Sequence, residues 1–212
     1  MIISHSRLSS ALLMTVLIAL INGCSVQQTK PETVNWEHHQ QRLLGLEQWH
    51  INGKMGYKQG SEGGSAWLDW QQNRDNFEVR LNGPFGAGTT SITGNARVTR
   101  LLQSDQQPIV ASSARELTRY LFGWYWPVED LRYWVRGVPS PLTPTHDQTR
   151  NEQQLLSTLE QAGWQLEFSN YANYPVNGQQ WSLPGKIRGK LLEDNGDTSF
   201  TLIIKSWQID AS

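Results

Sequence analysis

The sequence has little of several features that often reveal what a protein binds. It contains one cysteine and three methionines among 212 residues, and only 17% of its residues are charged. Lysine and arginine number 18 against 19 aspartates and glutamates, which gives a net charge of −1. Domains that bind nucleic acid carry a basic excess on one face. The balance of charges therefore predicts no nucleic-acid partner.

Long apolar runs are also missing. The longest, Ala11–Ile21, is interrupted only by Thr15, and it is much shorter than the roughly 20 residues that a membrane-spanning helix needs. A basic residue, Arg7, precedes it and small residues follow it. This order is typical of a secretory signal rather than of a membrane span. We therefore predict that residues 1–23 are a signal peptide.

The single cysteine, Cys24, lies at the end of this signal. The segment Leu20–Cys24 resembles the lipobox of bacterial lipoproteins, from which it departs at Asn22. The resemblance implies cleavage before Cys24, a diacylglycerol on its sulfur and an acyl chain on its amine. Because Ser25 rather than aspartate follows, it also implies the outer membrane, with the lipid-anchored chain facing the periplasm. The alternative is ordinary secretion with an incidental thiol, which is a liability in an oxidising compartment.

The segment after the cysteine, residues 24–34, is polar and lacks periodicity, so we predict a lipidated, flexible tether. A single domain is then expected over residues 35–212. Phe77, Val79 and Leu81 alternate with polar residues, which is the clearest pattern of a half-buried strand. Short strands separated by glycine, asparagine and aspartate turns predict an antiparallel meander or barrel. The expected strands are 51–57, 65–71, 77–81, 89–93, 97–103, 164–169, 186–192 and 198–209.

Three segments have the pattern of helices. Residues 35–48 place apolar side chains on one face behind Asn35, a suitable N-cap. Residues 113–116 (SARE) form a capping box, and Pro127 is expected to be the first residue of a further helix. Residues 155–160 fit either a strand or part of a helix, because a short apolar run does not distinguish the two.

Patterns for catalysis or metal binding are weak. His38 and His39 are adjacent, so they point to different sides of a helix and make poor co-ligands; we interpret them as solvated. Ser65 lies in Gly63–Trp67 (GGSAW), where tryptophan replaces the second glycine of a nucleophile elbow. The sequence therefore predicts no catalytic residue, no metal site and no enzyme activity.

The strongest positive signal is the count of ten tryptophans. They could simply fill a core, but indole side chains also suit an irregular apolar pocket. Trp67 and Trp70 are three residues apart in one expected strand, so they should point to opposite faces. Phe85 lies in a glycine- and proline-containing loop between two strands. It either folds back onto the sheet or projects as an apolar probe, since loops commonly carry function.

In their order and spacing, these residues resemble the LolB family of outer-membrane lipoproteins, which receive other lipoproteins and place them in that membrane. The resemblance covers the mature chain, from Cys24 through Pro84-Phe85-Gly86 and Leu131–Trp134 to Trp207. It implies a mainly antiparallel β fold with helices, an incomplete (half-open) β-barrel capped by α-helices around an apolar cavity. It also favours a strand over residues 155–160.

The resemblance further implies roles for particular residues. The candidates for lining the acyl cavity are Trp70, Trp134, Trp164 and Trp207. The candidates for a membrane-insertion loop are Pro84, Phe85 and Gly86. At the position of Phe85 the family usually carries a leucine.

The implied partners are a LolA-like periplasmic lipoprotein carrier, acylated lipoprotein cargo and the inner leaflet of the outer membrane, served by a monomer without nucleotide. No cofactor is expected beyond the covalent N-acyl and S-diacylglycerol lipid on Cys24. Two other functions stay open: a structural or adaptor lipoprotein of an envelope assembly, and a lipoprotein hydrolase using Ser65. An apolar cavity of roughly 300–1,000 Å³ without converging titratable groups would favour lipoprotein transfer.

Overall fold

The computed structural model describes residues 30–83, 88–95, 97–104, 106–122, 127–194 and 197–210, with the side chains of residues 120–122 left out. Two predicted sites lie outside the described residues. They are the lipid attachment at Cys24 and the membrane-insertion loop of Pro84, Phe85 and Gly86.

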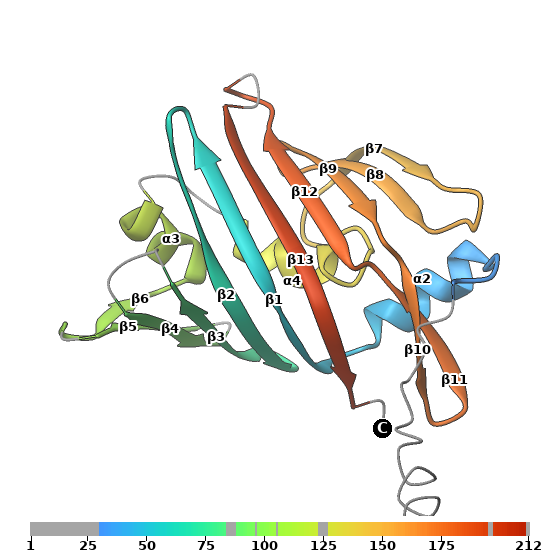
Figure 1. Cartoon of the computed structure of the whole chain (residues 1–212), viewed down its shortest axis with the longest axis horizontal. Helices are drawn as coiled ribbons and strands as arrows, with labels where there is room; N and C mark the ends of the chain where they lie inside the picture. Colours follow the sequence, from blue (N-terminus) through green and yellow to red (C-terminus); the bar gives the residue numbers. More distant parts are fainter. Residues whose placement is uncertain are drawn as a thin grey trace, which may run out of the picture.

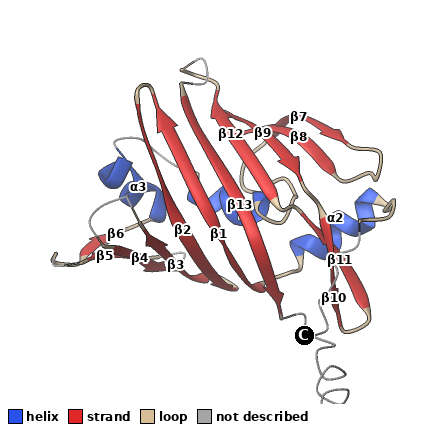
Figure 2. Cartoon of the chain, in the orientation of Figure 1, coloured by secondary structure: helices blue, strands red, loops and turns tan. Residues whose placement is uncertain are grey.

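One antiparallel sheet of 11 strands organises the described chain, in the order β6-β5-β4-β3-β2-β1-β13-β12-β9-β8-β7 (Figures 1 and 2). Because β6 and β7 are its two edges, the sheet is not closed, and the prediction of a half-open antiparallel barrel is confirmed. The strands of this sheet are β1 (Gln48–Gln59), β2 (Glu62–Asn73), β3 (Asn76–Asn82), β4 (Thr89–Gly94), β5 (Thr99–Gln103), β6 (Ile109–Ala111), β7 (Thr145–Arg150), β8 (Leu156–Gln161), β9 (Trp164–Ser169), β12 (Lys186–Leu191) and β13 (Thr198–Ile209).

The first helix, α2 (Trp36–Leu44), starts where expected but ends early. The side chain of Asn35 accepts a hydrogen bond from the His38 N–H at 2.9 Å, which confirms the N-cap. The predicted end at residue 48 is wrong, because the helix stops at Gly45 and Gln48 already begins β1. The alternation that buries Trp49 and Ile51 on one face of the sheet prevails over the helical pattern.

Two short helices follow, α3 (Ala114–Phe122) and α4 (Val128–Trp134). In Figure 1, α3 lies beside β2 and above β6, and α4 lies behind β1 and β13. The Ser113 hydroxyl accepts a hydrogen bond from the Glu116 N–H, as the capping box predicted. The Glu116 carboxylate, however, accepts from the N–H and hydroxyl of Ser112. Pro127 is the N-cap of α4 rather than its first helical residue, so that prediction is off by one position.

The segment at residues 155–160 is largely strand, because β8 runs from Leu156 to Gln161. A small hairpin beside the sheet was not predicted. It consists of β10 (Ala172–Val176) and β11 (Gln179–Leu183). The turn between them is Asn177-Gly178, and both residues have positive φ, 51° and 76°. An Asn-Gly pair of this kind is the strongest short-range hairpin signal in a sequence, so this element could have been found.

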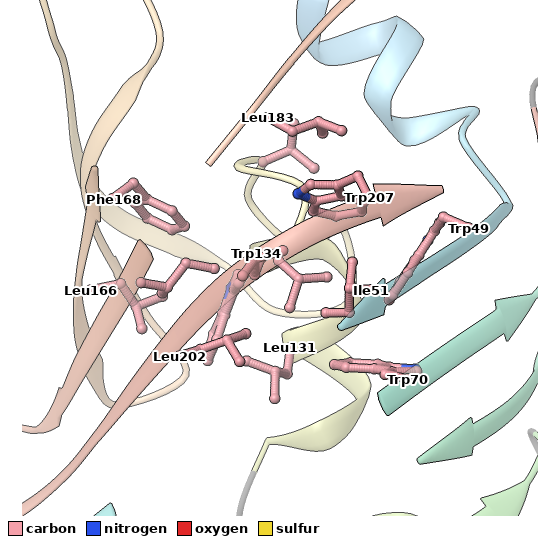
Figure 3. Close-up of a cluster of buried hydrophobic side chains, with 14 of the residues drawn as sticks. Trp49, Ile51, Trp70, Leu131, Trp134, Leu166, Phe168, Leu183, Leu202 and Trp207 are labelled. Atoms are coloured by element: carbon pink, nitrogen blue, oxygen red, sulfur yellow. The ribbon is translucent and has the colours of Figure 1, made fainter. Parts of the chain in front are cut away.

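The core lies on the concave face of the sheet, under α4 and α2. Figure 3 shows Leu131 and Trp134 of α4 among inward side chains of β1, β9 and β13, including Trp207. Gly53 interrupts the inward row of β1, at a point where the pairing of β1 with β13 shifts register. A Cβ atom at Gly53 would collide with the carbonyl oxygen of Ile203. Glycine is therefore required for β1 and β13 to approach this closely.

Candidate functional site

An apolar cavity of about 60 Å³ lies between the concave face of the sheet and the helices α3 and α4. No charged side chain lines it in the described part of the chain. The sheet contributes the larger side chains: Met55, Leu68, Trp70, Phe77, Val79, Leu81, Ile92, Phe200 and Leu202. The helices contribute Ala114, Thr118, Val128 and Leu131.

Strand alternation puts these side chains at the cavity. On β2, Leu68 and Trp70 are 4% exposed, whereas Trp67 is 53% exposed on the other face. This difference confirms the prediction that Trp67 and Trp70 point to opposite faces. The same period of two buries Val79 and Leu81 on β3.

The four predicted cavity tryptophans do not all reach the cavity. Trp70 lines it directly. Trp164 lies one layer behind, with its ring 5.3 Å from that of Phe200, a lining residue. Trp207 connects to Trp70 through Trp49, with ring separations of 5.6 Å and 5.0 Å.

Trp134 is fully buried in the core, where its Nε1 donates a hydrogen bond to the Gln161 side chain at 2.8 Å. It is absent from the lining of the cavity as this structure shows it. The acyl-binding role of the four tryptophans stays a prediction. Several lining residues, such as Ile92 and Phe200, were not singled out from the sequence, although their alternation along β4 and β13 gives the inward face.

A second pocket, of about 270 Å³, adjoins the cavity and shares Trp70, Phe77, Ala114 and Val128 with it. We call it the vestibule. Its remaining lining is mostly polar and consists of Gln72, Asp75, Asn95, Ser113, Glu129, Arg132 and Leu142. An apolar cavity that continues into a polar vestibule suits a molecule with an apolar chain and a polar head.

Arg132 is the cationic side chain among the described residues that line the vestibule. Its guanidinium lies 3.3 Å from the Asp75 carboxylate and donates a hydrogen bond to the Tyr133 hydroxyl at 2.9 Å. It also lies over the Tyr133 ring. Its buried Nε has no hydrogen-bond partner among the described residues. A buried N–H without a partner is costly.

The cavity is smaller than the sequence led us to expect. Ligand pockets usually enclose roughly 300–1,000 Å³, whereas this one has about 60 Å³. A wider groove of the structure, about 890 Å³, is lined mainly by polar residues such as Gln71, Asn76 and Gln208. The cavity therefore has the expected apolar lining but not the expected volume. An acyl chain can enter only if the cavity widens.

The prediction of solvated histidines is wrong for His39. Its side chain is 5% exposed and faces the β10–β11 hairpin, because α2 turns this side toward the body. Burial, assisted by the positive charge of Arg42, lowers the pKa of His39 from 6.5 to about 4. His39 is therefore neutral near pH 7 and belongs to the packing of α2.

The signals for catalysis and metal binding gain no support. Ser65 lies within β2, not at the strand-to-helix turn of a nucleophile elbow. No cluster of three or more histidine, cysteine, aspartate or glutamate residues within the described ranges could hold a metal. In those ranges, too, no helix has the length and apolarity to cross a bilayer.

Comparison with known proteins identifies the family. Residues 47–207 match the family described as Outer membrane lipoprotein LolB. The outer-membrane lipoprotein LolB of Cellvibrio japonicus is 39% identical over 198 residues, covering 93% of this chain and 96% of the relative. That of Francisella tularensis is 35% identical over 211 residues, covering 98% of both chains.

A solved structure described as an outer membrane lipoprotein-sorting protein domain, from Vibrio parahaemolyticus, has a TM-score of 0.51. It is 12% identical and covers 84% of this chain and 94% of its own, so the likeness concerns the fold alone. The family match spans most of the sheet and all of the described cavity. The chain belongs to the outer membrane lipoprotein LolB family.

Proposed function

We propose that this protein receives acylated lipoproteins from a LolA-like periplasmic carrier and inserts them into the outer membrane without nucleotide. Membership of the LolB family supports this role. The observation that carries it is the apolar cavity that continues into the polar vestibule. The cavity takes an acyl chain, and the vestibule takes the polar groups that join the chain to the cargo.

Such a transfer needs no external source of free energy. Each acyl methylene exposed to water costs about 0.8 kcal/mol, so a lipoprotein moves between apolar sites rather than through solution. A tenfold preference for the next site requires only about 1.4 kcal/mol. Contacts with a few side chains such as Trp70 and Phe77 are sufficient for that difference. The cargo then moves downhill from carrier to receptor to bilayer.

The helices are the movable wall of the cavity in this proposal. Among its described side chains, α3 contributes only Ala114 and Thr118 to the lining. Leu117 of the same helix is buried as well, at 1% exposed. The free energy of separating α3 from the sheet scales with the apolar area that becomes exposed, at about 25 cal/mol per Å². The sheet side, with its large side chains and continuous strand pairing, is harder to displace. We therefore assign the widening of the cavity to an outward shift of α3.

The lipid and the loop supply the contact with the membrane. Cys24, acylated as its lipobox implies, holds the protein at the outer membrane, and Phe85 enters the bilayer during release. The described ends of the loop support this part. Asn82 and Thr89 pair across β3 and β4, and the Thr89 hydroxyl donates a hydrogen bond to the Asn82 side chain at 2.7 Å. The base of the loop is thus fixed to the sheet.

A substitution that fills the cavity tests the proposal. In Ala114→Phe the added ring occupies the space under α3, and we expect affinity for a fluorescent fatty acid to fall about tenfold or more. Overpacking costs about 1–3 kcal/mol, so thermal unfolding must show that the fold persists. The matched control is Val110→Phe, because Val110 is 60% exposed on β6. Equal fatty-acid binding by both variants would remove the cavity from the proposal.

A further inference from the structure

The sheet face that points away from α3 and α4 carries an exposed apolar group. Trp67 is 53% exposed and Ile203 is 41% exposed. Both flank Lys54 in one cross-strand row, since Trp67 pairs with Lys54 and Lys54 pairs with Ile203. The ammonium of Lys205 lies 4.2 Å from the centre of the Trp67 ring. In Figure 1 the strands of this face, β2, β1, β13 and β12, lie side by side in front of α4.

Lysines surround this apolar group, while two acids of the same face, Asp69 and Glu167, are engaged. Asp69 contacts His50 at 2.8 Å, and Glu167 lies 3.9 Å from Arg188. None of the lysines lies within 4.0 Å of a carboxylate oxygen in the part of the chain that the structure describes. The lysines are Lys54, Lys58, Lys186, Lys190 and Lys205. With Trp67 and Ile203 they form what we call the basic outer face.

This concentration of charge is local. The whole chain has a net charge of −1, so the excess of cations on one sheet face is balanced elsewhere. Lysine lowers the free energy of binding to an anionic lipid surface by about 1 kcal/mol per residue. Tryptophan is enriched where its ring can lie among lipid headgroups. The cores of protein–protein interfaces, in contrast, are depleted of lysine.

We propose that the basic outer face binds an anionic phospholipid surface. The inference rests on the proposed function, which brings this protein to a bilayer. Trp67 pairs with Asn82 across β2 and β3, and Asn82 is the base of the loop that carries Phe85. The face therefore extends to the base of that loop. When the face lies on the headgroups, α3 and α4 stay on the side open to a carrier.

Vesicle binding by the mature chain with Cys24→Ser, which has no lipid attachment site, tests the inference. We expect sedimentation with vesicles of equal parts phosphatidylglycerol and phosphatidylcholine, weakened by salt, and little with phosphatidylcholine alone. Trp67→Ser and Lys54→Glu should each lower the affinity roughly tenfold, about 1.4 kcal/mol. The controls are Val110→Ser for an exposed apolar residue and Arg97→Glu for charge reversal. Val110 lies on the edge strand β6 and Arg97 lies between β4 and β5, so both are outside the basic outer face and should bind like the parent.

Unchanged binding in Trp67→Ser and Lys54→Glu would overturn the inference. So would a loss of carrier binding by these variants without a loss of vesicle binding, because the face would then be a protein docking surface. Cargo receipt from the carrier in solution, measured on the same variants, separates this inference from the proposed function. If the parent receives cargo and the variants differ only in vesicle binding, both hold. If the parent receives none, the proposed function fails whatever the vesicles show.

Discussion

The side-chain amide of Gln161, in β8, holds together β8, α4 and the segment that follows α4. Its Oε1 accepts hydrogen bonds from the Trp134 indole at 2.8 Å and from the Ser140 N–H at 2.9 Å. Its Nε2 donates to the carbonyls of Ser140 and Thr143 at 2.8 Å and 2.7 Å. The side chain is fully buried. It fixes Trp134 beneath the sheet and holds the segment that follows α4.

Gln161→Leu should therefore be strongly destabilising. The change leaves the Trp134 indole N–H and the Ser140 N–H buried without partners, and each such group costs about 1–3 kcal/mol. We expect the free energy of unfolding in urea to fall by about 2–5 kcal/mol. Gln165→Leu, at an exposed position of β9, is the control and should change it little. Similar stability of the two variants would contradict the role of Gln161.

Phe85→Glu tests the residue proposed to enter the membrane. A carboxylate is costly to bury in a bilayer, so the variant should receive cargo but fail to deposit it in vesicles. Folding should be unaffected, as judged by circular dichroism. The measurement is the fraction of labelled lipoprotein that sediments with vesicles after transfer. Normal deposition by the variant would remove Phe85 from the mechanism.

At the level of single residues, the sequence predicted the direction in which side chains point better than it predicted their burial. The alternation of β2 predicted that Trp67 and Trp70 point apart, because side-chain direction in a strand follows local geometry. It did not predict the burial of His39. That burial depends on the β10–β11 hairpin, which lies more than a hundred residues away in the chain.

At the level of elements, the first helix depends on contacts distant in sequence. Arg136 is 4% exposed, and its guanidinium donates hydrogen bonds to the carbonyls of Leu43 and Leu46 at 2.7 Å and 2.6 Å. These carbonyls lie at and just after the end of α2, where backbone acceptors lack helical partners. Burial lowers the pKa of Arg136 to about 10, so it stays charged at neutral pH. Arg136 thus fixes the end of α2 against the chain after α4.

The buried His39 gives α2 a pH dependence. The pKa of His39 is about 4 in the folded state, below its ordinary value of 6.5. As pH falls below 6.5 the unfolded state takes up the proton first, so stability is lost between pH 6.5 and pH 4. We expect a loss of about 2 kcal/mol between about pH 7 and pH 5. His39→Gln should lack this part of the slope in urea titrations, and an unchanged slope would contradict the burial argument.

Local patterns also located most strands but not all of their ends. The predicted ranges for β9 and β13 agree with the structure, because clear turns bound them. β1 and β2 are longer than predicted, and a tight turn at Gly60-Ser61 joins them. Glycine-rich ends weaken the apolar alternation in these strands, while hydrogen bonding between the strands continues.

At the level of the whole molecule, the half-open sheet places two different surfaces back to back. The concave face holds the apolar cavity and its vestibule under α3 and α4. The opposite face carries Trp67, Ile203 and the lysines. The sequence indicated the barrel through its resemblance to a family, but not the volume of the cavity. That volume depends on how helices and sheet pack, which local periodicity does not encode.

The central step of the proposed function is the movement of an acylated protein from one apolar site to another, and a direct transfer assay tests this step best. A purified complex of the periplasmic carrier with a labelled lipoprotein is mixed with the mature chain carrying Cys24→Ser, without nucleotide. Gel filtration then measures how much label leaves the carrier. We expect that most of the lipoprotein moves to this protein, and that Ala114→Phe reduces the transfer. Lipoprotein that stays on the carrier would contradict it.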